Sequence, residues 1–190
     1  MTGPVIRTPK AAAFADLWYE TRAQLAQPFP TKEEMPLRKL APFMSHMALI
    51  CIDADDRAKY LLFGTAISSL IGVDLTGHYL DQAMDPGAVA QMRDGLAAFR
   101  DEYGQDARRG RWAVTHAETT GGRLVEYEDV SLPYVLPETG EVRMMTYLSV
   151  LEPMKHGEKF VKRFASHDIT WFNAADARPD WLYLRATAAA

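Results

Sequence analysis

The chain has 190 residues, which is enough for one globular domain and short for two. A hydrophobic fraction of 48% with 24% charged residues is typical of a folded domain and excludes an intrinsically disordered chain. The net charge of −4 argues against general binding to nucleic acid or anionic membranes, and a single cysteine excludes an internal disulfide. The N-terminus lacks the apolar core of a signal peptide and no segment is long enough to span a bilayer, so we expect a cytoplasmic protein.

The first element that the sequence predicts is an amphipathic helix beginning near Phe14. Residues 1–13 contain two prolines and no periodicity, so we expect them to form a flexible leader. From Phe14 to Leu25, apolar residues that include Trp18 follow helical spacing. The pair Gln27-Pro28 ends the helix, because a residue before proline avoids the helical conformation.

Two short apolar runs follow, at residues 47–53 and 59–64, and together they predict a β-hairpin. The turn between them carries Asp53, Asp55 and Asp56, an acidic cluster that faintly resembles a calcium loop. It lacks the glycine and the distal glutamate of such a loop, which favours a solvated turn.

A long helix over residues 85–103 is the clearest prediction from the sequence. Asp85 is a suitable N-cap, Pro86 suits the first helical position, and Gly104 supplies the stop. A shorter helix is expected just before Gly72, which can take the left-handed conformation that ends a helix.

The period then changes to two, which predicts an antiparallel meander of three strands over residues 111–120, 123–132 and 141–151. In the middle strand, alternation puts Glu126, Glu128 and Val130 on one face and Tyr127, Asp129 and Ser131 on the other. Residues 152–190 form a C-terminal extension that is rich in aromatic residues. We expect this extension to dock on the domain or on a partner.

The order of elements and several local motifs resemble the PAS domain family, in particular the short stand-alone bacterial PAS proteins formerly catalogued as a domain of unknown function. The matching features are Leu17-Trp18, the apolar strand from Ala48 to Asp53, the strand from Tyr60 into Gly64-Thr65, the turn from Gly72 to Gly77, and Leu132-Pro133 with Gly140 and the last strand, Met144 to Leu151. The resemblance covers residues 14–151.

The resemblance implies an α+β fold with a five-stranded antiparallel sheet and helices on one face. The N-terminal helix would flank this domain, and the aromatic extension lies outside the family pattern. Many family members carry an arginine in the strand before Gly-Thr, whereas this chain has Leu61-Leu62-Phe63. Asp74 and Thr76, within the turn that matches the family, are expected to bond nearby backbone amides, which is a structural role.

We find no sequence motif for a metal, a cofactor or nucleophilic catalysis. The five histidines are widely separated, and no pair has the close spacing of zinc ligands. Cys51 lies in a strand expected to be buried, and there is no Gly-x-Ser-x-Gly motif. The flavin-binding Asn-Cys motif and the helical histidine of haem-binding PAS proteins are both missing, so we expect no cofactor. Arg108, Arg109 and Arg111 are interpreted as a solvated turn and not as a nucleic-acid site.

A pocket between the sheet and the helices remains as the candidate binding site. Its candidate lining residues are Phe63, Met92, Leu96, Trp112, His116, Tyr127 and Tyr147. His116 is singled out because a histidine in a pocket can bind an anionic or pH-dependent ligand. The alternative is that these residues simply fill the core.

We therefore predict a non-catalytic PAS-like sensory module that binds a small metabolite and signals through a partner protein. The alternative is a ligand-free protein–protein interaction or dimerisation module, with a homodimer formed through the N-terminal helix and its Phe14, Trp18 and Leu25. A small enzyme would need His116 with Glu118 or Glu128, and no motif supports it.

Overall fold

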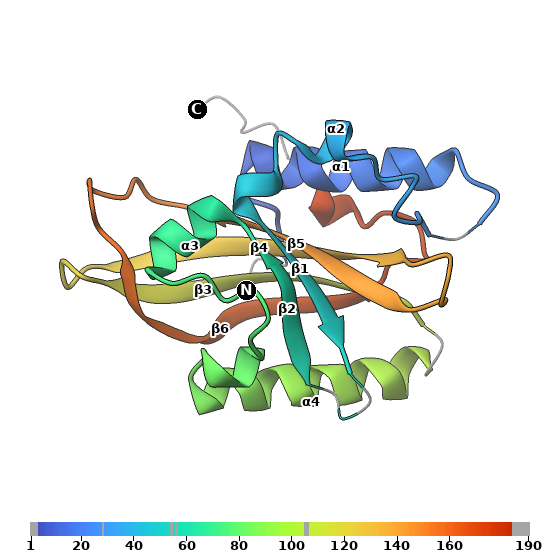
Figure 1. The fold of residues 1–190 in the computed structure, drawn as a ribbon. Coiled ribbons are helices and arrows are strands. Elements are labelled where there is room, and N and C mark those ends of the chain that lie inside the picture. The colour runs from blue at the N-terminus through green and yellow to red at the C-terminus, as the bar shows by residue number, and fades with distance from the viewer. Residues whose placement is uncertain (1–3, 28, 54, 56, 105–106, 184–190) are drawn as a thin grey trace.

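The computed structural model describes residues 4–27, 29–53, 55, 57–104 and 107–183 (Figure 1). The longer helices are α1 (Pro9–Ala23), α3 (Thr65–Ile71) and α4 (Pro86–Tyr103), with a single turn at α2 (Leu37–Leu40). The strands are β1 (Met47–Ile52), β2 (Ala58–Phe63), β3 (Arg109–Thr119), β4 (Leu124–Val135), β5 (Val142–Val150) and β6 (Phe160–Asn173). Short 3₁₀ turns occur at Met44–His46, Leu80–Gln82 and Asp180–Leu182.

The strands form one antiparallel sheet in the order β2-β1-β5-β4-β3-β6. The predicted hairpin is β1 with β2, and the predicted meander is β3, β4 and β5. The α+β fold class with an antiparallel sheet is confirmed. The expected number of strands is wrong by one, because the sheet has six strands in the described part of the chain.

The sixth strand, β6, comes from the segment predicted as a C-terminal extension. It pairs antiparallel with β3 from Thr119↔Phe160 to Arg109↔Asn173, with register shifts on the way. Phe160 and Phe172 are buried, so two of the aromatic side chains of this segment belong to the core of the sheet. The strand lies at a sheet edge and its register shifts, so its sequence lacks regular apolar–polar alternation. For this reason the sequence pattern did not predict a strand here.

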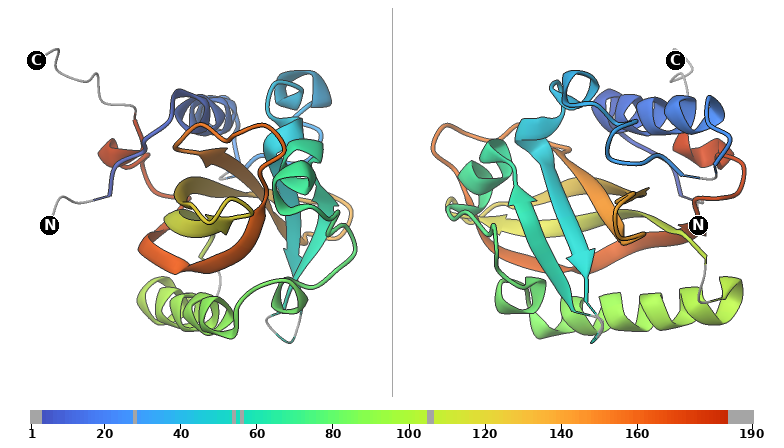
Figure 2. Two further views of the ribbon diagram at one scale, coloured as in Figure 1. Left: turned by 90° about the vertical axis from the view of Figure 1, so that its left-hand side faces the viewer. Right: turned by 45° about the vertical axis from the view of Figure 1, so that its right-hand side comes forward.

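Helices α3 and α4 cover one face of the sheet, as predicted, and the N-terminal flanking helix α1 packs on the other (Figure 1, Figure 2). Helix α1 packs on the outer face, where Phe14 and Trp18 are fully buried with side chains of β3, β4 and β5. The Trp18 indole donates a hydrogen bond to the Pro133 carbonyl oxygen at 2.6 Å. The inner face is covered by α3 and α4, which lie on the opposite side of the sheet.

The N-terminal segment was predicted to be a flexible leader up to residue 13, but in the structure the helix begins earlier. Helix α1 begins at Pro9, and its N-cap is Thr8, whose hydroxyl accepts a hydrogen bond from the Ala11 N–H. Ile6 is buried, and its N–H donates to the Trp181 carbonyl oxygen near the other end of the chain. Residues 1–3 and 184–190 of the predicted terminal segments lie outside the described part of the chain.

The local signals around the two inner helices match the structure. The Asp85 side chain accepts from Gly87 N–H at 2.8 Å as the N-cap of α4. Gly72 ends α3 with φ of +84°, a left-handed conformation. In the following turn, the Asp74 carboxylate accepts from the N–H and the hydroxyl of Thr76. The Thr76 hydroxyl in turn accepts from the Phe63 N–H at 3.1 Å, which fastens this turn to β2.

The acidic turn between β1 and β2 is held by its own first carboxylate. Asp53 Oδ1 accepts from the backbone N–H groups of Asp55 and Arg57. Asp56 lies outside the described residues. Cys51 on β1 is a free thiol that is only partly buried, with its Sγ 3.8 Å from the Lys59 carbonyl oxygen.

Candidate functional site

A cavity of about 130 Å³ lies between the inner face of the sheet and the helices α3 and α4. Most of its wall is apolar and comes from β1, β2, β5 and the two helices. The apolar lining residues include Ala48, Ile50, Ile52, Ala58, Phe63, Ile67, Ile71, Leu80, Met84, Ala88, Met92, Met144, Leu148 and Ile169. The arrangement resembles a ligand pocket in general form: an apolar enclosure with a few polar groups on one side.

The polar side of the cavity is built on β3, β4 and β6. The Arg111 guanidinium forms an ion pair with the Asp129 carboxylate and donates from Nη2 to the Ser166 hydroxyl at 3.1 Å. The Ser166 hydroxyl also lies 2.8 Å from that of Thr115. Because these side chains bind one another, their positions are fixed before any ligand enters.

Several charged groups line the cavity. Three guanidinium groups, those of Arg109, Arg111 and Arg163, line the cavity with one carboxylate, that of Asp129. Burial raises the pKa of Asp129, and the adjacent Arg111 opposes that shift. We place Asp129 in its charged form because it is in direct contact with Arg111.

Two tyrosines, Tyr60 of β2 and Tyr127 of β4, also line the cavity. Burial raises the pKa of Tyr127 to about 12 and also raises that of Tyr60. Both tyrosines therefore keep their protons, and stay uncharged, at neutral pH.

Helix α4 is fixed to β6 beside the cavity by two contacts. The Gln91 side chain donates to the Ser166 carbonyl oxygen at 2.6 Å and accepts from the Ser166 N–H at 2.8 Å. One turn further on, the helix approaches β6 so closely that a Cβ on Gly95 would lie 2.3 Å from the Trp171 indole nitrogen. The cavity and the α4–β6 contact therefore share Ser166.

The structure places three of the seven predicted pocket residues around this cavity. Phe63, Met92 and Tyr127 line it, whereas Leu96 is buried on α4 and is not among the lining residues. Whether the three bind a ligand stays a prediction.

Trp112, His116 and Tyr147 lie on the outer face of the sheet, so their placement in an inner pocket is wrong. The physical reason is side-chain alternation. Thr115 pairs with Tyr127 and faces the cavity, so His116, the next residue along β3, faces outward. Tyr147 lies opposite Val130 and packs on Phe14 of α1.

The sequence predicted the two faces of β4 correctly but did not predict that Arg111 of the neighbouring strand β3 faces the same cavity. Tyr127, Asp129 and Ser131 all line the cavity, as alternation indicated. Arg111 was interpreted as part of a solvated turn, and this is wrong, because it lies in β3 with its guanidinium paired to Asp129. The two-residue period of residues 111–115 was a usable signal, since it puts Arg111, Ala113 and Thr115 on one face.

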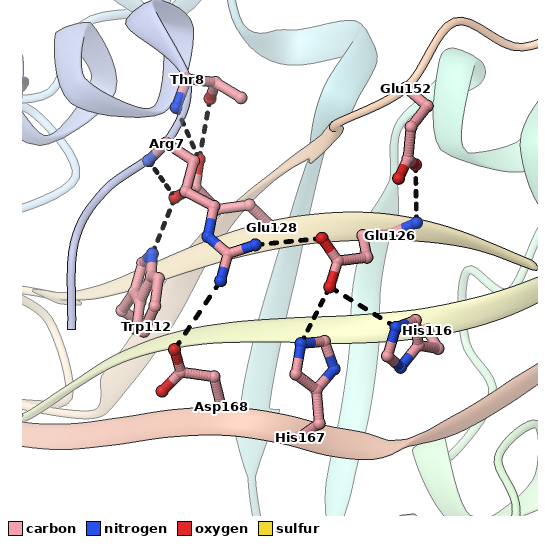
Figure 3. Close-up of polar contacts among 9 residues, drawn as sticks. All are labelled: Arg7, Thr8, Trp112, His116, Glu126, Glu128, Glu152, His167 and Asp168. Carbon is pink, nitrogen blue, oxygen red and sulfur yellow. Dashed lines mark hydrogen bonds and ion pairs between the residues drawn. The ribbon is translucent and has the colours of Figure 1, made fainter. Parts of the chain in front are cut away.

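A second polar cluster lies on the outer face, where β4, β3 and β6 run side by side (Figure 3). The Glu126 Oε1 atom lies 3.0 Å from His167 Nε2 and 3.5 Å from His116 Nε2. The two imidazole rings are stacked, with centroids 4.1 Å apart. The other oxygen of Glu126 accepts a hydrogen bond from Arg7 Nη1 at 3.0 Å. The histidines are far apart in the chain, so their spacing in the sequence carried no signal of this cluster.

Beside it, the fully buried Glu128 attaches the N-terminal segment to the sheet (Figure 3). Its carboxylate accepts from the N–H groups of Arg7 and Thr8, from the Thr8 hydroxyl and from the Trp112 indole. The pairing of His116 with Glu128 considered for an enzyme is not formed, because His116 faces Glu126 and the carboxylate of Glu128 is bound to these four donors.

No family model matches the sequence, and no curated protein matches it. A solved PAS domain of a protein from Colwellia psychrerythraea has a TM-score of 0.39 and 12% identity, over 60% of this chain and 96% of that chain. A likeness at that level carries no inference about function. Among the described residues, no helix has the length and hydropathy needed to cross a membrane.

Proposed function

We propose that this chain is a PAS-like sensory module that binds a small metabolite in the cavity between the sheet and α4. The metabolite has an apolar body and an anionic group, and its binding is transmitted to a partner protein. The proposal draws on one observation above all: an apolar cavity whose single polar side carries three guanidinium groups and one carboxylate.

The size and the chemistry of the cavity limit the ligand. A cavity of about 130 Å³ is close to the ~150 Å³ engineered cavity that binds benzene. The apolar walls of β1 and β2 favour a hydrocarbon body, while a guanidinium binds a carboxylate through two parallel hydrogen bonds. A small aromatic or branched aliphatic carboxylate meets both requirements.

Transmission would use the hydrogen bonds that join the cavity to α4. An anion that binds Arg111 competes with Asp129 and with the Ser166 hydroxyl for the same guanidinium. Ser166 is also held through its backbone by Gln91. A change in the hydrogen bonds of Arg111 can therefore reach the surface helix α4 through Ser166 alone.

The first experiment is native mass spectrometry of the purified chain, followed by denaturation and analysis of any released small molecule. Titration with benzoate, and with the uncharged isostere benzamide, then tests the charge preference. We expect benzoate to bind and benzamide to bind at least about tenfold more weakly, since a hydrogen-bonded charge contributes about 1.5–3 kcal/mol. Equal affinities, or no binding of either probe by a chain that carries no co-purified ligand, would count against the proposal.

A matched pair of variants on α4 locates the site. Ala88 lines the cavity and is buried, whereas Ala97 is exposed on the same helix. Ala88→Met fills part of the cavity and should abolish benzoate binding, while Ala97→Met should leave it unchanged. Loss of binding in both variants, or in neither, would place the ligand elsewhere.

The alternative, a ligand-free interaction or dimerisation module, is favoured by β6. This strand is an edge of the sheet, and Val161 on it is 61% exposed. The predicted dimer surface on α1 is largely used within the chain, because Phe14 and Trp18 are buried against the sheet. Light scattering over a range of concentrations measures the oligomeric state, and a dimer disrupted by Val161→Lys would support the β6 edge as the interface.

A further inference from the structure

We propose that His116, Glu126 and His167 bind one divalent transition-metal ion, such as Zn²⁺, on the outer face of the sheet. The three residues come from β3, β4 and β6 and each offers one ligand atom, and these atoms all lie within 4.8 Å of one another. This site lies on the opposite face of the sheet from the ligand cavity and is independent of it.

The distances from Glu126 to the two histidines fit a tetrahedral ion. Zinc bonds to nitrogen and oxygen of about 2.0–2.2 Å place neighbouring ligand atoms about 3.4 Å apart. The distances of 3.5 Å and 3.0 Å from Glu126 Oε1 to the two imidazoles lie on either side of that value. The side chains of both histidines are 35% exposed, so an ion can enter and a ring can turn by the small amount that closes the triangle.

The carboxylate is already oriented by groups outside the triad (Figure 3). Glu126 directs Oε1 to the histidines, while its Oε2 is held by Arg7 Nη1, and its backbone N–H donates to Glu152 Oε2 at 2.7 Å. Arg7 is itself positioned by its own N–H, which donates to Glu128 Oε1 at 2.6 Å. Hydrogen bonds to the far side of a ligating carboxylate are a regular feature of protein metal sites, and they fix the geometry before binding.

The charges around the triad favour a divalent cation. The Arg7 guanidinium pairs with Glu126 and Asp168, and the Glu152 carboxylate lies against the backbone N–H of Glu126. These three carboxylates and one guanidinium leave two negative charges when the imidazoles are neutral. The imidazole rings are stacked 4.1 Å apart, a distance at which two protonated rings would repel each other. One divalent ion bound to neutral rings balances the cluster without this repulsion.

The donor set selects the type of ion. Two imidazoles and one carboxylate suit Zn²⁺, Cu²⁺ or Ni²⁺, whereas Mg²⁺ and Ca²⁺ prefer oxygen ligands. Three protein ligands leave a position open for water. Because the ligands lie on three adjacent strands, the ion would join the edge strand β6 to β3 and β4.

The experiment is calorimetric titration of the full chain, prepared without a polyhistidine tag, with Zn²⁺ as the probe. We expect one ion per chain and a rise in Tm on binding, because an ion that binds the folded state alone stabilises it. Replacing Zn²⁺ with Co²⁺ should give the visible absorption of a low-symmetry cobalt site with nitrogen ligands.

His167→Gln and Glu126→Gln should each weaken Zn²⁺ binding by about tenfold or more and remove the cobalt signal. The matched control is His156→Gln, since His156 is exposed and outside the cluster. Circular dichroism checks that each variant is folded, and His116→Gln provides a third ligand variant if one of the others is not. Absence of Zn²⁺ binding by the wild type, or equal affinity in the control and the ligand variants, would overturn the proposal.

Discussion

Replacing the buried Glu128 with glutamine tests how strongly the N-terminal segment is attached to the sheet. The carboxylate accepts four hydrogen bonds, two on each oxygen: Arg7 N–H and the Trp112 indole on Oε1, and the N–H and hydroxyl of Thr8 on Oε2. A glutamine keeps one acceptor oxygen and presents an NH₂ group where the other oxygen was. The two groups that donated to the replaced oxygen would then face an NH₂ group, which is itself a donor and cannot accept their hydrogen bonds.

The expected cost follows from the number and type of these bonds. A hydrogen bond to a charged group contributes about 1.5–3 kcal/mol, and an unpaired buried donor costs about 1–3 kcal/mol. The Thr8 hydroxyl can turn to accept from the new amide, so one of the two lost bonds is partly recovered. We expect Glu128→Gln to lower the free energy of unfolding by about 3 kcal/mol. For a chain of this length that corresponds to a fall in Tm of roughly 6–12 °C.

The assay is urea unfolding followed by tryptophan fluorescence. The matched control is Glu138→Gln, at an exposed residue, which should change the free energy of unfolding by less than about 0.5 kcal/mol. Thr8→Val removes the hydroxyl partner, so the double variant Thr8→Val/Glu128→Gln should cost less than the sum of the two single variants. A loss below about 1 kcal/mol for Glu128→Gln, or strict additivity in this cycle, would refute the attachment described here.

Three further changes test the inner face and the turns. The pKa of Tyr127 is raised to about 12 from an ordinary value of 10, so its contribution to stability is complete below pH 10 and is lost as the pH rises to about 12. Tyr127→Phe should therefore remove one late step from the ultraviolet titration of tyrosinate. The control variant Tyr183→Phe, at an exposed residue, should leave that step in place. Gly95→Ala places a Cβ against the Trp171 indole and should destabilise the fold in urea by about 1–3 kcal/mol, while an unchanged midpoint would contradict the close packing of α4 on β6. Gly72→Ala puts a side chain at φ of +84° and should cost about 1–2 kcal/mol in the same assay; no loss would mean that the turn adopts another conformation.

Local signals in the sequence were sufficient for much of the fold. The cap at Asp85 and the stop at Gly104 determine α4, and Gly72 ends α3, because a cap or a left-handed turn depends on a few neighbouring residues. Alternation in β4 was likewise enough to put Tyr127 and Asp129 on one face, since the two-residue period is a property of the strand itself.

Other features depend on contacts between distant segments, and the tertiary structure decided them. Pairing of residues 160–173 with β3 makes an expected extension into the sixth strand, and the register of that pairing brings His167 beside His116. A shift of one residue in that register would turn His167 to the opposite face. The sequence by itself therefore determined the helix α4, the end of α3, the strands β1 to β5 and which residues share a strand face, but not the strand β6. Only the tertiary structure decided which face meets the cavity and which distant side chains come together, because strand pairing and register are set by the packing of the whole sheet.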